Sequence, residues 1–259
     1  MSYKTVIYQK DDTIARVTLN RPEVLNAYSI QMRDDLYEIF TAVRDDPDVR
    51  VMIISGAGRA YCAGADLSEF GTTPSPVIAR SVRWARDVWG VLRNMNKITV
   101  VAMHGHALGS GLELAMMCDL RLAAEGTRFG LPETSLGFIP AAGGTQSLPR
   151  GVKAGTALAM VLSSERIDAT EALRIRLVNR VVPAGSLMAE AEALAQRVLS
   201  GAPLAVGLVK EAMNRGLDLS LEQGLDGERR LADLIFATSD AWEGLRAQVE
   251  GREALFRGK

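Results

Sequence analysis

Two glutamates follow chain segments that can turn sharply, and their type and placement make them the strongest candidates for chemistry. Glu113 comes directly after a glycine-rich turn, and Glu133 follows a proline in the sequence RFGLPET. Two carboxylates that flank one site can act as general acid and general base at a carbon next to a carbonyl group. A lone glutamate at a helix start is usually only favourable to the helix dipole. The pair therefore predicts proton-transfer chemistry only if both residues reach the same site.

The glycine-rich turn HGHALGSGLEL lies between an expected buried strand and an expected helix. Its glycines allow a sharp turn that leaves N–H groups at the helix start free for a phosphate or a developing oxyanion. A dinucleotide fingerprint is disfavoured because Leu114 occupies the position of its third glycine, and the Gly-Lys ending of a Walker loop is absent. Leu108 and Leu112 replace the glycines of a serine-hydrolase elbow around Ser110. Taken alone, the segment favours a tight turn without a ligand.

The elements that must position these residues alternate between strands and helices. The first 20 residues indicate a β-hairpin, and Ser29 is a plausible N-cap of an amphipathic helix that runs to about Val43. RVMIISG, KITVVAMHG and DLRLAA indicate strands, and a helix is expected from roughly Val77 to Leu92. This order predicts an α/β fold. Helical periods dominate the C-terminal part, so we expect a core over residues 1–190 and a helical region over 191–259.

Composition excludes several classes of protein. The 259 residues are 47% hydrophobic and carry a formal net charge of −1, which is ordinary for a globular protein and gives no overall attraction to nucleic acid or anionic membranes. The longest apolar region is interrupted by His104, His106 and Glu113, which a membrane helix rarely carries. Cys62 and Cys118 are too few for a disulfide framework. We therefore expect a cytoplasmic protein that binds neither nucleic acid nor a membrane.

Three motifs in the order GRAYCAGADL, HGHALGSGLELAMMCD and FGLPETSLGFIPAAGGTQ give a more specific expectation. Together they resemble the crotonase superfamily, and most closely its enoyl-CoA hydratases; the resemblance runs from RPEVLNA to the C-terminal helices. It implies a crotonase-like core of repeated ββα units and a C-terminal helical region for oligomerisation. It also implies homotrimers, or hexamers made of two trimers.

The resemblance assigns roles residue by residue. Glu113 matches the glutamate that activates water, and Glu133 matches the one that exchanges a proton at the carbon next to the thioester. Ala65 and Ser110 match the two positions whose backbone N–H groups form the oxyanion hole. The positions that match the substrate and CoA site are Val24, Leu25, Ala63, Gly64, Asp66, Leu67, Gly109 and Pro132.

The implied activity is the reversible addition of water to a 2-enoyl-CoA thioester, with CoA entering as part of the substrate and no metal or other cofactor. An enoyl-CoA isomerase or a hydratase of cyclic acyl-CoA is the nearest alternative, and a non-catalytic binding protein of the same fold is more distant. Glu23 and Ser68 stand where the family often has lysine, so the residues that bind the CoA phosphates stay open. The segment GTTPSPVIARSVRW is expected to shape the acyl pocket, and His104 and His106 to have packing roles.

Overall fold

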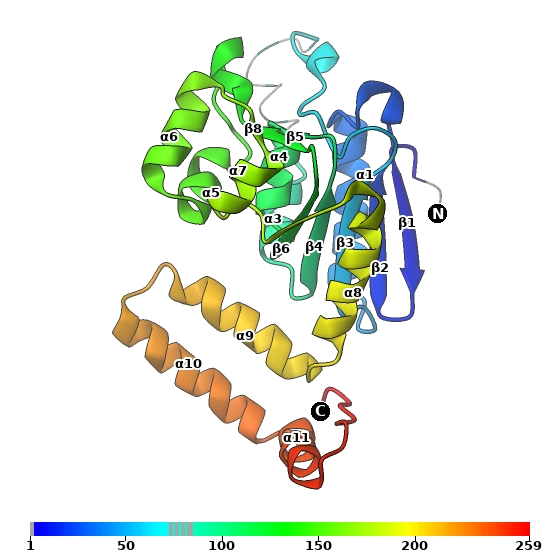
Figure 1. Ribbon diagram of the computed structural model, residues 1–259, viewed down its shortest axis with the longest axis vertical. Helices are drawn as coiled ribbons and strands as arrows, with labels where there is room; N and C mark the ends of the chain where they lie inside the picture. The colour runs from blue at the N-terminus through cyan, green and yellow to red at the C-terminus, as the bar shows by residue number, and fades with distance from the viewer. Residues whose placement is uncertain (1–2, 73–74, 76–77, 79–80, 82–84) are drawn as a thin grey trace.

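The chain begins with the expected hairpin, whose strands form the edge of the main sheet (Figure 1). The computed structural model describes residues 3–72, 75, 78, 81 and 85–259. Strand β1 (Val6–Asp11) pairs antiparallel with β2 (Ile14–Leu19), with Val6 opposite Leu19. Asp12 takes a left-handed conformation with φ of 51°, which lets the two strands join through a tight turn.

The main sheet continues from β2 through parallel strands in the order β1-β2-β3-β4-β6-β9. The added strands are β3 (Val51–Gly56), β4 (Ile98–Met103), β6 (Leu120–Ala124) and β9 (Arg180–Val182). Every residue of β4 is buried, which explains why the sequence shows a continuous apolar run instead of alternation. The strands expected from RVMIISG, KITVVAMHG and DLRLAA are thereby confirmed.

Both faces of the sheet are covered, and successive residues of β4 belong to different cores. Val101 and Met103 pack with helix α1 (Ile30–Asp45) on one face. Val100 and Ala102 pack on the other face with helix α8 (Leu187–Leu199). The predicted boundary between residues 190 and 191 falls inside α8, so the helix that covers the second face of the core lies across that division.

A second sheet of short strands holds the glycine-rich turn. It contains β5 (His106–Leu108), β7 (Arg128–Gly130) and β8 (Ile167–Asp168) in the order β5-β7-β8. The N–H of Gly109 donates to the carbonyl of Gly130 at 2.9 Å, which fixes the turn against β7. Strands of two or three residues leave no periodicity in the sequence, which is why they were not predicted.

Side-chain caps start the two helices α1 and α3. Ser29 accepts a hydrogen bond from the Met32 N–H at 3.2 Å and caps α1, which confirms the predicted N-cap. The helix expected from Val77 to Leu92 lies partly outside the described residues, and its described part is interrupted. Helix α3 covers only Val88–Arg93, because Asp87 accepts from the Gly90 N–H at 2.8 Å and starts a new helix there.

The remaining elements are helices and short helical turns that connect the strands. Helix α4 (Ser110–Met116) follows the glycine-rich turn. The other segments are η1 (Pro22–Val24), η2 (Leu67–Glu69), η3 (Pro132–Leu136), α5 (Gly144–Gly151), α6 (Ala154–Ser163), α7 (Ala169–Arg174) and η4 (Ala184–Ser186).

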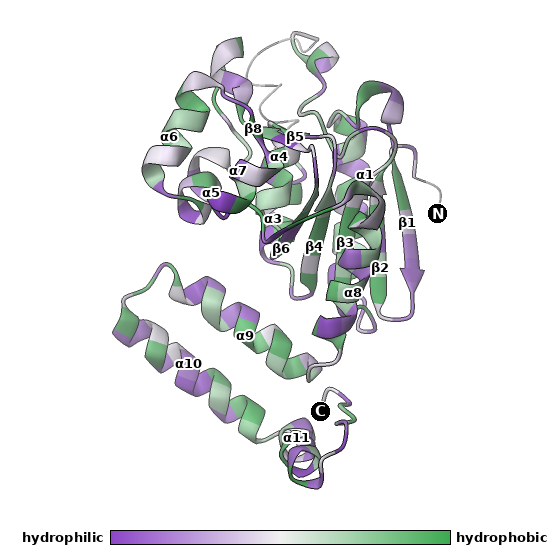
Figure 2. Cartoon of the chain, viewed as in Figure 1, coloured by the Kyte–Doolittle hydropathy of each residue, from purple (hydrophilic) through white to green (hydrophobic). Residues whose placement is uncertain are grey.

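Three C-terminal helices form an arm that projects away from the main sheet (Figure 1). They are α9 (Pro203–Gly216), α10 (Leu221–Phe236) and α11 (Ser239–Glu250). Figure 2 shows that hydrophobic and hydrophilic residues alternate along α9 and α10. Lys210 anchors the arm, since its ammonium group donates to Asp119 at 2.7 Å and to the Lys97 carbonyl at 2.8 Å. Within the described part of the chain, no helix is long and apolar enough to cross a membrane.

Candidate active site

Two glycines bring two loops into close contact at the head of α4. Gly64 and Gly109 both have positive φ, of 111° and 48°. A Cβ added to Gly109 would lie 3.5 Å from the Cα of Gly64 and 2.8 Å from Oε1 of Glu133. Only glycine permits this backbone conformation at such an approach. The two residues that follow these glycines, Ala65 and Ser110, are therefore brought to neighbouring positions.

Ala65 and Ser110 present backbone N–H groups at this contact. Tyr28 forms a parallel bridge with Ala65, through its N–H to the Gly64 carbonyl at 2.8 Å and its carbonyl to the Asp66 N–H at 2.9 Å. Those bonds do not use the N–H of Ala65. Among the described residues, neither the Ala65 nor the Ser110 N–H donates a backbone hydrogen bond. Two such donors side by side can stabilise an oxygen that acquires negative charge.

Glu113 is buried, and the start of helix α5 holds its carboxylate. It lies in the first turn of α4 with 1% of its surface exposed. Its Oε1 accepts hydrogen bonds from the N–H of Ala142 at 2.9 Å and of Gly144 at 2.8 Å. Gly143 caps α5 with φ of 108°, which turns these N–H groups towards the carboxylate. Donors of this kind stabilise the charged form of a carboxyl group.

Glu133 has a different environment. It lies in η3 directly after Pro132, and burial raises the pKa of its carboxyl group above the ordinary value. Its Oε2 is buried and has no hydrogen-bond partner among the described residues. Desolvation without a compensating partner favours the neutral acid. The two carboxyl groups thus have different environments: backbone N–H groups donate to Glu113, whereas Oε2 of Glu133 has no partner among the described residues.

One cavity of about 510 Å³ brings these groups together. Its wall contains both glutamates and most of the residues that the sequence motifs predicted. The predicted residues in the wall are Ala63, Gly64, Ala65, Leu67, Gly109, Ser110, Glu113, Pro132 and Glu133. The volume is within the range of small-molecule sites, so the cavity can hold the reactive part of a substrate.

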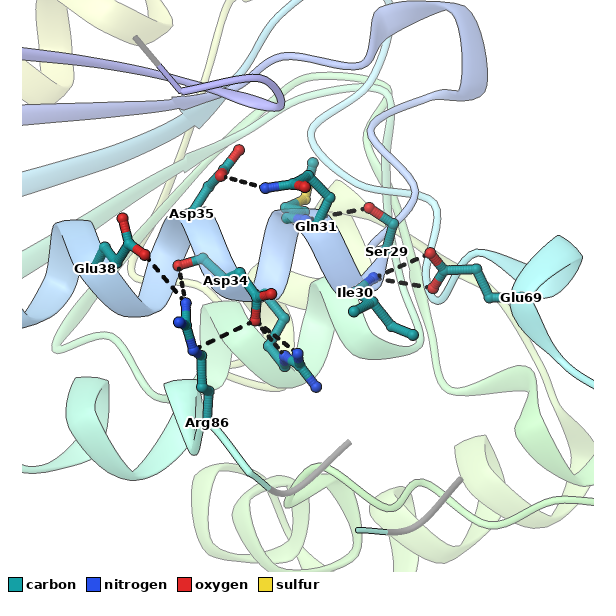
Figure 3. Close-up of polar contacts among 10 residues, drawn as sticks. Ser29, Ile30, Gln31, Asp34, Asp35, Glu38, Glu69 and Arg86 are labelled. Carbon is teal, nitrogen blue, oxygen red and sulfur yellow. Dashed lines mark hydrogen bonds and ion pairs between the residues drawn. The ribbon is translucent and has the colours of Figure 1, made fainter. Parts of the chain in front are cut away.

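Helix α1 holds two walls of this cavity in place (Figure 3). At its N-terminus, the Ile30 N–H donates to the Glu69 carboxylate at 2.9 Å and fixes η2. Further along, Glu38 accepts from Arg86 at 3.2 Å, and Asp34 lies 3.7 Å from the same guanidinium group. Because Arg86 lies next to Asp87, the N-cap of α3, these contacts position the start of that helix at the cavity.

Three predicted binding residues do not line the cavity. Val24 and Leu25 lie at the end of η1, where Leu25 takes a left-handed conformation with φ of 53°. The Asp66 carboxylate accepts hydrogen bonds from Arg21 at 2.9 Å and from the Ser68 hydroxyl at 2.6 Å. Ser68 is therefore committed to this loop contact, and the CoA roles of Val24, Leu25 and Asp66 stay predictions.

The aromatic part of the wall was not predicted, and only Phe138 lies within one of the three motifs. Tyr28, Phe70, Trp89 and Phe138 all line the cavity, yet they come from four separate segments. They had no common spacing that could have joined them. The N–H groups of Ala142 and Gly144 that donate to Glu113 were not predicted either. The FIPAAGGTQ motif marks their loop, but it does not indicate that the loop contacts a carboxylate from another segment.

Among the described residues, His104 and His106 belong to no cluster of metal-ligating side chains. Nε2 of His104 lies 3.0 Å from the Gly58 carbonyl, which agrees with a packing role. Within residues 3–72, 75, 78, 81 and 85–259, no group of three or more His, Cys, Asp or Glu residues could hold a metal ion.

Comparison with known proteins identifies the family. The family model described as "Enoyl-CoA hydratase/isomerase" matches residues 9–259. The chain belongs to this family. The resemblance that was inferred from the three motifs is thereby confirmed.

Two relatives and one solved structure illustrate how far this family likeness extends. The chain is 40% identical to a probable enoyl-CoA hydratase of Mycobacterium bovis, over 99% of each chain. It is also 40% identical to a crotonyl-CoA hydratase of Syntrophomonas wolfei, over 100% of each. The crystal structure of an enoyl-CoA hydratase from Bacillus anthracis superposes with a TM-score of 0.94 at 34% identity, covering 99% of this chain and 100% of the other. The predicted crotonase-like fold of this enoyl-CoA hydratase/isomerase family member is therefore confirmed.

Proposed function

We propose that this chain is an enoyl-CoA hydratase, a hydro-lyase that reversibly adds water to the double bond of a 2-enoyl-CoA thioester. Family membership and the full-length relatives support this activity. The observation that carries the mechanism is the pair of glutamates in one cavity, one with N–H donors on its carboxylate and one whose pKa is raised by burial.

In the proposed reaction, Glu113 takes a proton from water while the water oxygen bonds to C3 of the enoyl group. The electron pair of the double bond moves towards the thioester and gives an enolate. The N–H groups of Ala65 and Ser110 stabilise the enolate oxygen, each contributing about 3 kcal/mol by analogy with oxyanion holes in general. Glu133 then donates a proton to C2. Proton exchange with solvent water removes the proton from Glu113 and returns one to Glu133, which restores both groups for the next turnover. The reverse reaction uses the same groups with their roles exchanged.

The proposed reaction adds the elements of water and changes no net oxidation state. It therefore requires no redox cofactor, and the backbone N–H groups supply the polarisation of the carbonyl. CoA enters and leaves as part of the thioester. A cytoplasmic location is part of the proposal and is supported by Cys62 and Cys118, which are both free and buried thiols.

The raised pKa of Glu133 gives a pH prediction. Because Glu133 must be protonated to donate to C2, we expect kcat/KM to fall as pH rises through the folded-state pKa of this group. The free energy of unfolding changes in the same direction. Because burial disfavours the carboxylate, the folded chain loses stability as pH rises through that pKa. A pH profile of kcat/KM with crotonyl-CoA measures this fall in activity. A profile that rises with pH throughout the range would contradict the role given to Glu133.

We also propose that the arm of α9–α11 contacts other copies of the chain, in a trimer or a hexamer of two trimers. In the single chain, α9 and α10 contain no buried residue. Met213 on α9 is 67% exposed, and Leu217, the C-cap of this helix, is 82% exposed. Helices of this length gain most of their stability from burying an apolar face, so a partner surface is required.

If α9 contacts another copy of the chain, one charge added to its exposed apolar surface should weaken the assembly. Met213→Asp places a charge on the exposed apolar surface of α9, and we expect it to shift the protein from about three or six times the chain mass of 27.9 kDa to the monomer. Asn214→Asp is the matched control, because it adds the same charge at the next, polar position. Light scattering coupled to size exclusion measures both. A monomeric parent protein would contradict the proposed assembly.

The proposed activity is tested by mixing the purified protein with crotonyl-CoA. Loss of the absorbance of the conjugated enoyl thioester, with formation of 3-hydroxybutyryl-CoA, is the expected result. An unchanged absorbance at micromolar enzyme would count against a hydratase of linear short-chain substrates.

A further inference from the structure

The cavity wall gathers aromatic rings in a chain that has few of them. Aromatic residues make up only 5% of the sequence, yet Tyr28, Phe70, Trp89 and Phe138 all line this one cavity. They form two edge-to-face pairs. Tyr28 and Trp89 have ring centroids 4.8 Å apart, and Phe70 and Phe138 have centroids 5.3 Å apart. The catalytic glutamates line the same cavity, so these rings lie within the substrate site.

The two pairs join elements that are separate in the sequence. Tyr28 precedes α1 and Trp89 lies on α3, so the first pair connects these two helices. Phe70 follows η2 and Phe138 follows η3, so the second pair connects the loop of Ala65 to the segment of Glu133. Each pair therefore places ring surface beside a segment that carries a catalytic group or supports one.

Besides the two glutamates, three charged residues line the cavity: Arg86, Asp87 and Arg93. Arg86 and Asp87 are paired within the protein. The Asp87 carboxylate accepts from the Gly90 N–H and caps α3. Arg86 is directed to Glu38 and Asp34 of α1, as Figure 3 shows. These charges are used to hold α3 in place. The wall that they support presents Trp89 and Tyr28 to the cavity.

The size of the cavity allows a ring beside the reacting group. Its volume is about 510 Å³. A cavity of about 150 Å³ in an apolar protein interior is enough to bind benzene. The cavity can therefore contain a phenyl ring together with the enoyl thioester carbons. Rings prefer edge-to-face or offset contacts with other rings, and a flexible alkyl chain gains only from the burial of its surface.

We propose that the acyl group of the preferred substrate is aryl-substituted, with a phenyl-type ring on C3 of the enoyl thioester. This inference rests on the proposed hydratase function and names the substrate class of the same site. Trp89 and Phe138 are the specificity-determining residues, one from each aromatic pair. They contact the ring of the substrate and take no part in proton transfer.

The chemistry of such a substrate determines how it is assayed. A ring conjugated to the double bond stabilises the enoyl thioester, so the favourable direction is dehydration. The 3-hydroxy-3-arylpropanoyl thioester loses a proton from C2 and hydroxide from C3; the C–O bond breaks, the double bond forms, and water leaves. Cinnamoyl-CoA formed from 3-hydroxy-3-phenylpropanoyl-CoA has an extended conjugated absorbance that reports the rate directly.

The test compares two thioesters with the same number of acyl carbons, 3-hydroxy-3-phenylpropanoyl-CoA and 3-hydroxynonanoyl-CoA. Their intrinsic reactivities differ, so the informative quantity is the ratio of their kcat/KM values in each variant relative to the parent protein. We expect Trp89→Leu to lower this ratio about tenfold, which corresponds to about 1.4 kcal/mol. We expect Trp89→Phe, which keeps a ring, to lower it less than threefold.

Phe138→Leu is the second variant, and it protects the test against a folding failure of Trp89→Leu because Phe138 is 50% exposed. We expect it to lower the same ratio about fivefold. An unchanged ratio in both leucine variants, or turnover of the nonanoyl thioester alone, would overturn the aryl proposal and leave the hydratase intact. Absence of turnover with both thioesters and with 3-hydroxybutyryl-CoA would overturn the proposed function as well.

Discussion

Glu113→Gln is expected to lower kcat for crotonyl-CoA hydration about 10³-fold, with a much smaller change in KM. The glutamine side chain keeps an oxygen that can accept the hydrogen bonds from the N–H groups of Ala142 and Gly144. The amide cannot take a proton from water, so the variant loses the proposed base and retains the shape of the site. Steady-state kinetics at saturating crotonyl-CoA measure the effect.

Glu125→Gln is the matched control for this prediction. Glu125 is exposed and lies directly after β6, outside the cavity wall. The same substitution there is expected to leave kcat within twofold of the parent value. A Glu113→Gln variant that keeps more than a tenth of the parent activity would show that another group activates the water.

Glu133→Gln is expected to reduce turnover about 10³-fold without a loss of stability. The proton that reaches C2 comes from this side chain in the proposed mechanism, and an amide cannot supply it. Burial raises the pKa of Glu133, which means that the folded chain disfavours its carboxylate. A neutral amide removes that cost, so we expect the thermal midpoint at pH above this pKa to stay equal or rise.

These two readouts separate a catalytic role of Glu133 from a structural one. A residue that only held η3 in place would lose stability and activity together. Glu165→Gln serves as the control, since Glu165 is exposed and outside the cavity wall. Parent-like turnover by Glu133→Gln would contradict the assignment of the C2 proton to this residue.

Local signals in the sequence predicted the parts of the fold that depend on neighbouring residues. The cap at Ser29 and the apolar runs of β3 and β4 needed no information from distant segments. The position of Glu113 in the first turn of a helix was also visible locally, but its assignment to the site depended on the family motifs. Local patterning and the family motifs together were sufficient to name both glutamates.

The parts that could not be predicted depend on contacts between distant segments. The two aromatic pairs join residues from separate elements, so their spacing carried no signal. The break before α3 arises because Asp87 bonds to Gly90, which competes with the helical pattern expected through Leu92. Helix α8 crosses the expected division because its small apolar residues, such as Ala191 and Ala195, face the sheet.

The measurement that tests the central claim most directly is the product of crotonyl-CoA conversion in D₂O, analysed by NMR. The account predicts 3-hydroxybutyryl-CoA with one deuterium at C2, because Glu113 directs solvent water to C3 and Glu133 delivers a solvent-derived proton to C2. A product with its double bond moved to C3, and no hydroxyl group, would contradict the hydratase and identify an isomerase. Recovery of unlabelled crotonyl-CoA would contradict both.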